Sequence, residues 1–146
     1  MKVEEFLLQL KHEDIVAAIR EAESKTSGEV RVFITRKTVE DPVAAAQEHF
    51  TKMGMEKTRE HNGVLIFVAP LSRKFAMIGD AGVHTRCGEG FWKHVADEMA
   101  GHFRESEFSA GIIKGICKAG ELLAQHFPRR ADDKNELSDE VEHDEE

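Results

Sequence analysis

Three short segments of this chain carry side chains that could bind a metal ion. Each combines an oxygen-bearing side chain with a glycine: Glu29 in residues 26–29, Asn62 in residues 60–63 and Asp80 in residues 79–82. Carboxylates, amide oxygens and backbone carbonyls are the ligands that calcium and magnesium prefer. The same residue types also form tight turns, so a turn without any ligand is the alternative interpretation of each segment.

The segments act together only if the fold brings them to one place. Residues 29–35 (EVRVFIT) and 64–69 (VLIFVA) are rich in β-branched and apolar side chains, which predicts two strands. A turn-rich connection then leads to a third strand over residues 74–79. A helix between the first two strands makes them parallel, whereas the hairpin makes the third antiparallel. Glu29, Asn62 and Asp80 are therefore expected at one edge of the sheet.

Four longer helices are predicted around this sheet, at about residues 12–25, 41–53, 91–103 and 108–127, after a short amphipathic turn at 3–10. Asp41-Pro42 is a typical helix start. Gly111 and Gly115, one turn apart, are expected to let a neighbouring element approach closely. The fold class is α/β, a three-layer α/β/α sandwich around an open mixed sheet. The expected inward side chains are Ile15, Ala18, Ile19, Ala22, Val43, Ala46, Phe50, Met53, Trp92, Val95, Met99, Phe103, Ile112, Ile116, Leu123 and Phe127.

Length and charge indicate one globular domain followed by an acidic tail. The chain has 146 residues, of which 40% are hydrophobic and 33% charged, which is ordinary for a globular protein. Residues 1–128 are predicted to form the domain. Residues 129–146 hold nine acidic and three basic residues and are predicted to be a disordered tail, or alternatively a segment that binds a protein partner.

Several classes of protein and location are disfavoured. No basic stripe is interleaved with aromatic residues, which argues against nucleic-acid binding. No signal peptide and no apolar run of membrane-spanning length is evident, so a cytoplasmic location is expected. Cys87 and Cys117 do not suggest a disulfide framework, and Cys87 is interpreted as structural or incidental.

Three other groups of residues offer weaker candidate sites. Basic side chains at the opposite sheet edge suggest an anion site, although solvated loop charges are the favoured interpretation: Arg36, Lys37, Arg73 and Lys74. Gly88-Glu89-Gly90 precedes a helix and is a weak phosphate-binding signal. His94, Glu98 and His102 have a helical spacing that zinc could use, but a partly exposed polar helix border is the simpler explanation, and no metal site is predicted from them.

Four stretches together resemble the TPM domain family over roughly residues 12–127. They are TSGEVRVFIT from residue 26, HNGVLIF from 61, GDAG from 79 and FRESEFSAGIIKG from 103. The chain resembles a compact branch that lacks the signal peptide and membrane helix of many relatives. The resemblance implies an α/β/α sandwich, a calcium ion or similar cation at loops matching the three segments, and an acid phosphatase activity.

Two positions depart from the pattern of the family. Many relatives place an aspartate before the Asn-Gly pair, where this chain has His61. Relatives also carry a Gly-x-Gly-x-Glu turn after the third strand, where His84 stands in place of a carboxylate; Asp80 or Glu89 could compensate. If neither compensates, cation binding weaker than in relatives is expected.

Three functions follow as hypotheses. The favoured one is an accessory or interaction module that binds calcium or magnesium at Glu29, Asn62 and Asp80. The alternative is a metal-dependent acid phosphatase at the same loops, with His61 or His84 as proton donor and no further catalytic residue assigned. The third is a scaffold that a protein partner recognises through the acidic tail.

Overall fold

The computed structural model describes residues 3–88, 90–129 and 141–143. The predicted helices and strands are present, with their ends shifted by a few residues. In chain order the elements are α1 (Val3–Gln9), α2 (His12–Glu23), β1 (Glu29–Ile34), α3 (Pro42–Lys52), η1 (Met55–Lys57), β2 (Gly63–Ala69), η2 (Pro70–Ser72), β3 (Lys74–Gly79), α4 (Ala81–Cys87), α5 (Gly90–Arg104), α6 (Phe108–His126) and β4 (Glu142–His143).

The strands form one mixed sheet in the order β3-β2-β1-β4. β1 and β2 are parallel with Glu29 opposite Gly63, and β2 and β3 are antiparallel with Val64 opposite Gly79. This confirms the predicted pairing of three strands. The sequence did not predict β4, whose two residues pair in parallel with the end of β1. The other residues of the predicted tail, apart from Arg129 and Val141, lie outside the described residues.

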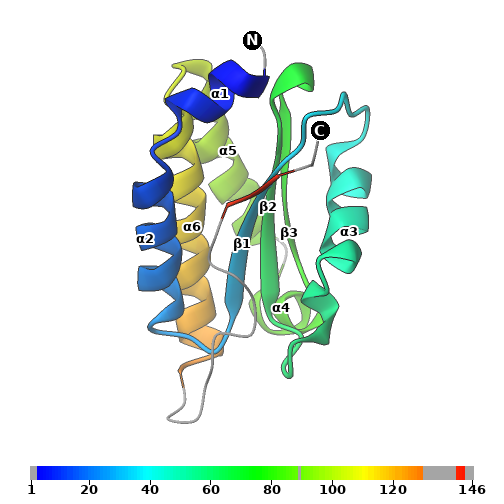
Figure 1. The fold of residues 1–146 in the computed structure, drawn as a ribbon. Coiled ribbons are helices and arrows are strands. Elements are labelled where there is room, and N and C mark those ends of the chain that lie inside the picture. The colour runs from blue at the N-terminus through cyan, green and yellow to red at the C-terminus, as the bar shows by residue number, and fades with distance from the viewer. Residues whose placement is uncertain (1–2, 89, 130–140, 144–146) are drawn as a thin grey trace.

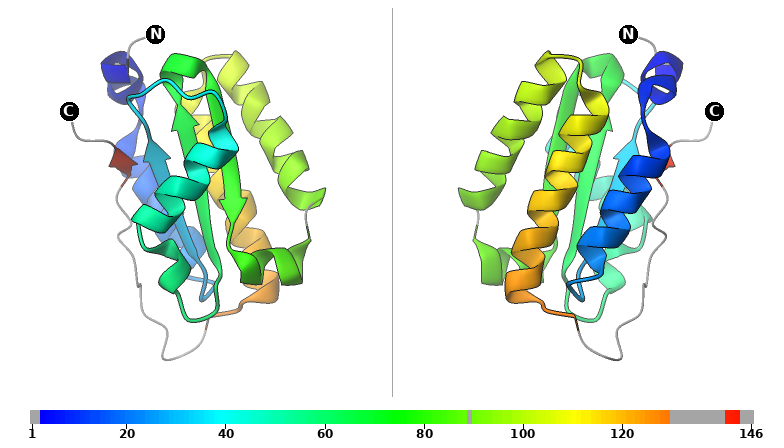
Figure 2. Two further views of the ribbon diagram at one scale, coloured as in Figure 1. Left: turned by 90° about the vertical axis from the view of Figure 1, so that its right-hand side faces the viewer. Right: turned by 90° about the vertical axis from the view of Figure 1, so that its left-hand side faces the viewer.

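Helices cover both faces of the sheet, which confirms the three-layer α/β/α sandwich (Figures 1 and 2). Helices α2, α5 and α6 lie on one face and α3 lies on the other. β2 is buried along its whole length, which explains its unbroken apolar sequence. The larger core includes Ile19, Val32, Ile66, Val95, Met99, Ile112 and Ile116, and the smaller includes Phe33, Ala46, Phe50, Met55, Leu65 and Phe67.

The structure differs from the prediction at two places. Val43, in the first turn of α3, is 48% exposed rather than inward. The buried residues of this helix are Ala46 and Phe50. Residues 81–87 form α4, whereas the sequence suggested only a turn after Asp80. Val83 is the one buried residue of α4, so this helix has too little apolar periodicity to be recognised.

The glycines of α6 allow α5 to pack closely, as predicted. A Cβ atom at Gly111 would lie 2.6 Å from the Phe103 ring, and one at Gly115 would lie 2.7 Å from the Met99 sulfur. These contacts show that α5 and α6 pack directly against each other. No helix within the described ranges is both long and apolar enough to cross a membrane.

Candidate functional site

The three segments predicted to converge do meet through their backbones at one edge of the sheet (Figure 1). The Glu29 amide donates to the Asn62 carbonyl at 3.4 Å, and the Asp80 amide donates to the Gly63 carbonyl at 2.9 Å. The Gly82 amide donates to the His61 carbonyl at 2.9 Å. The side chains of the predicted ligands, however, are used in three different ways.

Glu29 is engaged in a buried ion pair. Its carboxylate lies 2.8 Å from Arg31 Nη2, and the two side chains are 2% and 1% exposed. Arg31 Nη1 also contacts Glu23 Oε2 at 2.5 Å. Because an internal guanidinium already compensates the Glu29 charge, this carboxylate is a poor ligand for an added cation.

Asn62 connects two of the segments. Its side-chain amide donates to Ser27 Oγ at 3.1 Å and to Glu60 Oε2 at 3.3 Å. The Ser27 hydroxyl donates to the same Glu60 oxygen. Asn62 is 1% exposed, so this network fixes the 26–29 segment against the 60–63 segment inside the protein.

Asp80 has one carboxylate oxygen available. Oδ1 accepts the Ala81 amide at 2.7 Å, which makes Asp80 the N-cap of α4. Oδ2 is buried and accepts no hydrogen bond from any described residue. The nearest charged partner of Oδ2 is His61, whose Nδ1 lies 3.5 Å away and is positive only when the ring is protonated. Among the three predicted ligands, Asp80 therefore has the geometry of a cation ligand.

Asp80 opens onto a cavity of about 500 Å³ between α3, η1, β3 and α4. Glu56 of η1, His84 of α4 and Gln47 of α3 also line the cavity. Glu56 Oε2, like Asp80 Oδ2, is buried without a hydrogen-bond donor among the described residues. Two acidic residues, each with a buried oxygen that lacks a donor among the described residues, thus line one cavity, which suits a hard cation better than an anion.

Glu56 was not predicted from the sequence as a ligand. It belongs to no glycine-containing segment, and it reaches the cavity only because the chain after α3 turns back at Gly54, whose φ is 73°. Within the described ranges, no group of three or more histidine, cysteine or acidic side chains is arranged to hold a metal ion. Among the residues that the structure describes, Asp80 and Glu56 are thus the two acidic residues that line this cavity.

The histidine and cysteine candidates on α4 and α5 are not supported. His94 lies 3.4 Å from Glu98, whereas His102 lies 3.0 Å from Glu107, so these histidines do not share one ligand set. Burial raises the pKa of the Cys87 thiol, with Arg86 opposing the rise, so the thiolate is disfavoured at neutral pH. Glu89, and with it the centre of the glycine motif before α5, lies outside the described residues.

Comparisons with known proteins give a consistent result. The family model described as the TPM domain matches residues 2–122. The solution structure of BA42 from the psychrophilic bacterium Bizionia argentinensis is 35% identical, covers 91% of this chain and 92% of that chain, and has a TM-score of 0.84. The N-terminal domain of a P. gingivalis protein is 16% identical, covers 81% and 78% and has a TM-score of 0.61, which shows the fold alone. No curated protein matches the sequence.

Proposed function

Since this chain belongs to the TPM domain family, we propose that it is an accessory or interaction module that binds a divalent cation, calcium or magnesium, beside α4. The observation that carries the proposal is the buried Oδ2 atom of Asp80, which accepts no hydrogen bond from the described residues. A buried carboxylate oxygen without a donor is energetically unfavourable unless a cation or water reaches it. The cavity beside it supplies the space for such a ligand.

The proposed ligand set differs from the one that the sequence suggested. Asp80 is kept, and Glu56 is added because its free oxygen lines the same cavity. Glu29 is omitted because its charge is compensated by Arg31, and Asn62 is assigned to holding the 26–29 and 60–63 segments together. With two protein carboxylates, water would complete the coordination, and affinities in the range of about 10⁻⁴–10⁻³ M are appropriate.

A bound cation would stabilise the local structure by neutralising two acidic side chains on separate elements. Glu56 comes from η1 and Asp80 from the start of α4, so a shared ion links the chain after α3 to the chain after β3. In this proposal, the function of the site is to order these loops and not to catalyse a reaction.

We expect millimolar calcium or magnesium to shift the amide resonances of residues 54–63 and 79–84, and Asp80→Asn to weaken this response at least about ten-fold. Asparagine is also a good N-cap, so this variant keeps the start of α4 while it removes the charge. Saturable chemical-shift changes measured during cation titration give the affinity directly.

Glu56→Gln should weaken the cation response in the same way, and Glu21→Gln on the exposed face of α2 is the matched control. Cation-induced shifts that are absent from residues 54–63 and 79–84, or equal in the wild type and Asp80→Asn, would refute the site.

A metal-dependent phosphomonoesterase at these loops is the alternative, and His84 on the cavity wall is the one feature that favours it. Hydrolysis assisted by two metals would need more carboxylates than Asp80 and Glu56 provide. Turnover of an aryl phosphate that disappears in Asp80→Asn would favour the enzyme over the binding module. Turnover that persists in that variant would indicate a contaminating phosphatase.

A further inference from the structure

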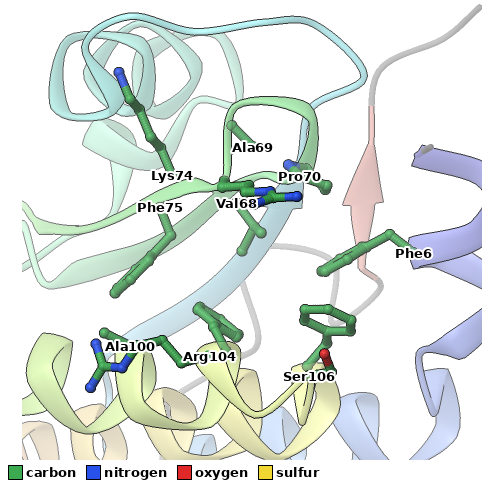
Figure 3. A pocket seen from close by; sticks show the side chains of 12 residues that line it. Phe6, Val68, Ala69, Pro70, Lys74, Phe75, Ala100, Arg104 and Ser106 are labelled. Carbon is green, nitrogen blue, oxygen red and sulfur yellow. The ribbon is translucent and has the colours of Figure 1, made fainter. Parts of the chain in front are cut away.

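A second cavity, of about 590 Å³, lies at the opposite end of the sheet (Figure 3). It is enclosed by α1, the turn between β2 and β3, and the connection between α5 and α6. Its volume falls within the range of about 300–1,000 Å³ that is usual for small-molecule sites. Open α/β sheets commonly bind ligands beyond the carboxyl ends of their strands, and the end of β2 contributes Val68 and Ala69 to this wall.

Four phenylalanine side chains form a continuous aromatic wall in this cavity. The ring of Phe6 lies 4.8 Å from that of Phe108, which lies 6.4 Å from Phe103, and Phe103 lies 5.1 Å from Phe75. They come from α1, α6, α5 and β3, so the wall exists only in the folded protein. Figure 3 shows Phe6 and Phe75 extending from opposite sides into the space between the strands and the helices. Such a wall favours an apolar ligand body of acyl or aryl type.

Two arginines place positive charge beside this apolar wall. Arg73 follows η2 and Arg104 ends α5; both line the cavity and are exposed. Neither side chain forms a salt bridge or hydrogen bond within the part of the chain that the structure describes. Among the described residues, no acidic side chain lines the cavity, although the whole chain carries a net charge of -8.

Two neighbouring basic residues at this edge, Arg36 and Lys74, are already engaged, which distinguishes them from this pair. Arg36 lies 3.1 Å from Glu4, and Lys74 Nζ donates to the Glu40 carbonyl at 2.7 Å. Figure 3 shows the Lys74 side chain directed away from the phenylalanine rings. Solvated loop charge therefore describes part of this edge, whereas Arg73 and Arg104 line the cavity and their guanidinium groups have no hydrogen-bond or ion-pair partner among the described residues.

From these observations we infer that the cavity binds a small amphipathic carboxylate. The acyl or aryl body would pack against Phe6, Phe75, Phe103 and Phe108, and the carboxylate would meet the guanidinium group of Arg73 or that of Arg104, which both line the cavity. Guanidinium groups match carboxylates in charge and in planar hydrogen-bond geometry. The site is independent of the proposed cation site, which lies at the other end of the strands.

The test is an amide chemical-shift titration of the full chain with sodium decanoate, below its micelle-forming concentration. We expect saturable shifts centred on residues 68–75 and 100–108. The variant R73Q/R104Q should bind decanoate at least about ten-fold more weakly, because it removes both guanidinium groups that are available to pair with the carboxylate. Lys93→Gln, which removes an exposed charge from the other end of α5, is the matched control and should change the affinity less than two-fold.

Two further ligands separate the contributions of body and head group. Decanol should bind more weakly than decanoate and with equal affinity to the wild type and R73Q/R104Q, because it lacks the charge. Acetate should give no saturable shifts in this region, because it lacks the apolar body. The inference is overturned if decanoate produces no saturable shifts around the cavity, or if R73Q/R104Q, with an otherwise native spectrum, binds decanoate as tightly as the wild type.

Discussion

Arg31→Ala should lower the free energy of unfolding by about 3–5 kcal/mol, because it removes the cation from a buried cluster that contains two carboxylates. Arg31 is 1% exposed and lies between Glu23 of α2 and Glu29 of β1. A domain of this kind is stable by only about 5–15 kcal/mol, so the loss is a large share of the total. Equilibrium denaturation in urea measures it.

Besides the two ion pairs, the side chains of Glu23 and Arg31 form hydrogen bonds with the backbone of β1 at Val30. The Val30 amide donates to Glu23 Oε2 at 2.8 Å, and the Val30 carbonyl accepts from Arg31 Nη1 at 2.5 Å. Removing Arg31 leaves this carbonyl without that donor and Glu23 and Glu29 without that cation. Arg31→Lys should be intermediate, since a single ammonium cannot reproduce the guanidinium's separate contacts.

The exposed pair between Lys25 and Glu21 is the matched control. These side chains are 68% and 71% exposed and lie 3.2 Å apart, so Lys25→Ala should cost less than about 1 kcal/mol. A double-mutant cycle between Arg31→Ala and Glu29→Gln should show strong coupling. Glu29→Gln should lower the free energy of unfolding far less in the Arg31→Ala background than in the wild type. A loss below about 1 kcal/mol for Arg31→Ala would contradict this account of the cluster.

Gly82→Ala is expected to destabilise the fold by about 1–3 kcal/mol and to displace the start of α4. A Cβ atom at this position would lie 2.4 Å from the Glu60 carbonyl oxygen and 2.6 Å from that of His61. Both are backbone atoms, so no side-chain rotation relieves the contact. Urea denaturation reports the loss of stability, and amide shifts at residues 60–63 report the displacement.

Gly101→Ala provides the same chemical change at an open position. Its nearest neighbour would be Arg104 Nη2 at 3.9 Å, in ordinary contact distance, and the residue lies inside α5. Alanine is favoured over glycine in helix interiors, so this variant should gain roughly 0.5–1 kcal/mol. If both alanine variants changed stability in the same direction and by the same amount, the close approach at Gly82 would have no energetic importance.

The Gly82 contact also affects the proposed cation site. Its amide donates to the His61 carbonyl at 2.9 Å, and His61 itself has a φ of 51°, a left-handed conformation that needs support from its surroundings. Moving α4 away would shift Asp80 relative to Glu56. Gly82→Ala should therefore weaken cation binding as well as stability, unlike Gly101→Ala.

Local sequence patterns predicted the elements and their pairing because those properties depend on neighbours along the chain. The apolar run of β2, the Asp41-Pro42 start of α3 and the hairpin before β3 each have a short-range physical cause. These patterns, with the motifs of the TPM domain, were sufficient for the sandwich and for the sheet edge where Glu29, Asn62 and Asp80 lie. They were not sufficient for α4, which has one buried side chain, or for the two-residue strand β4.

The roles of the polar side chains at that edge depend on the partners that the tertiary structure brings to them. The sequence predicts that Glu29 begins a strand next to Asn62, but it does not predict that Arg31, two residues later, pairs with Glu29 and with Glu23 of α2. In the same way, Glu56 joins Asp80, and four phenylalanines join Arg73 and Arg104, across elements far apart in the chain. This is because the role of a charged side chain depends on which partner lies within a few ångströms of it after folding. Sequence spacing determines the strand, and the packing of helices on the sheet determines which partner each side chain meets.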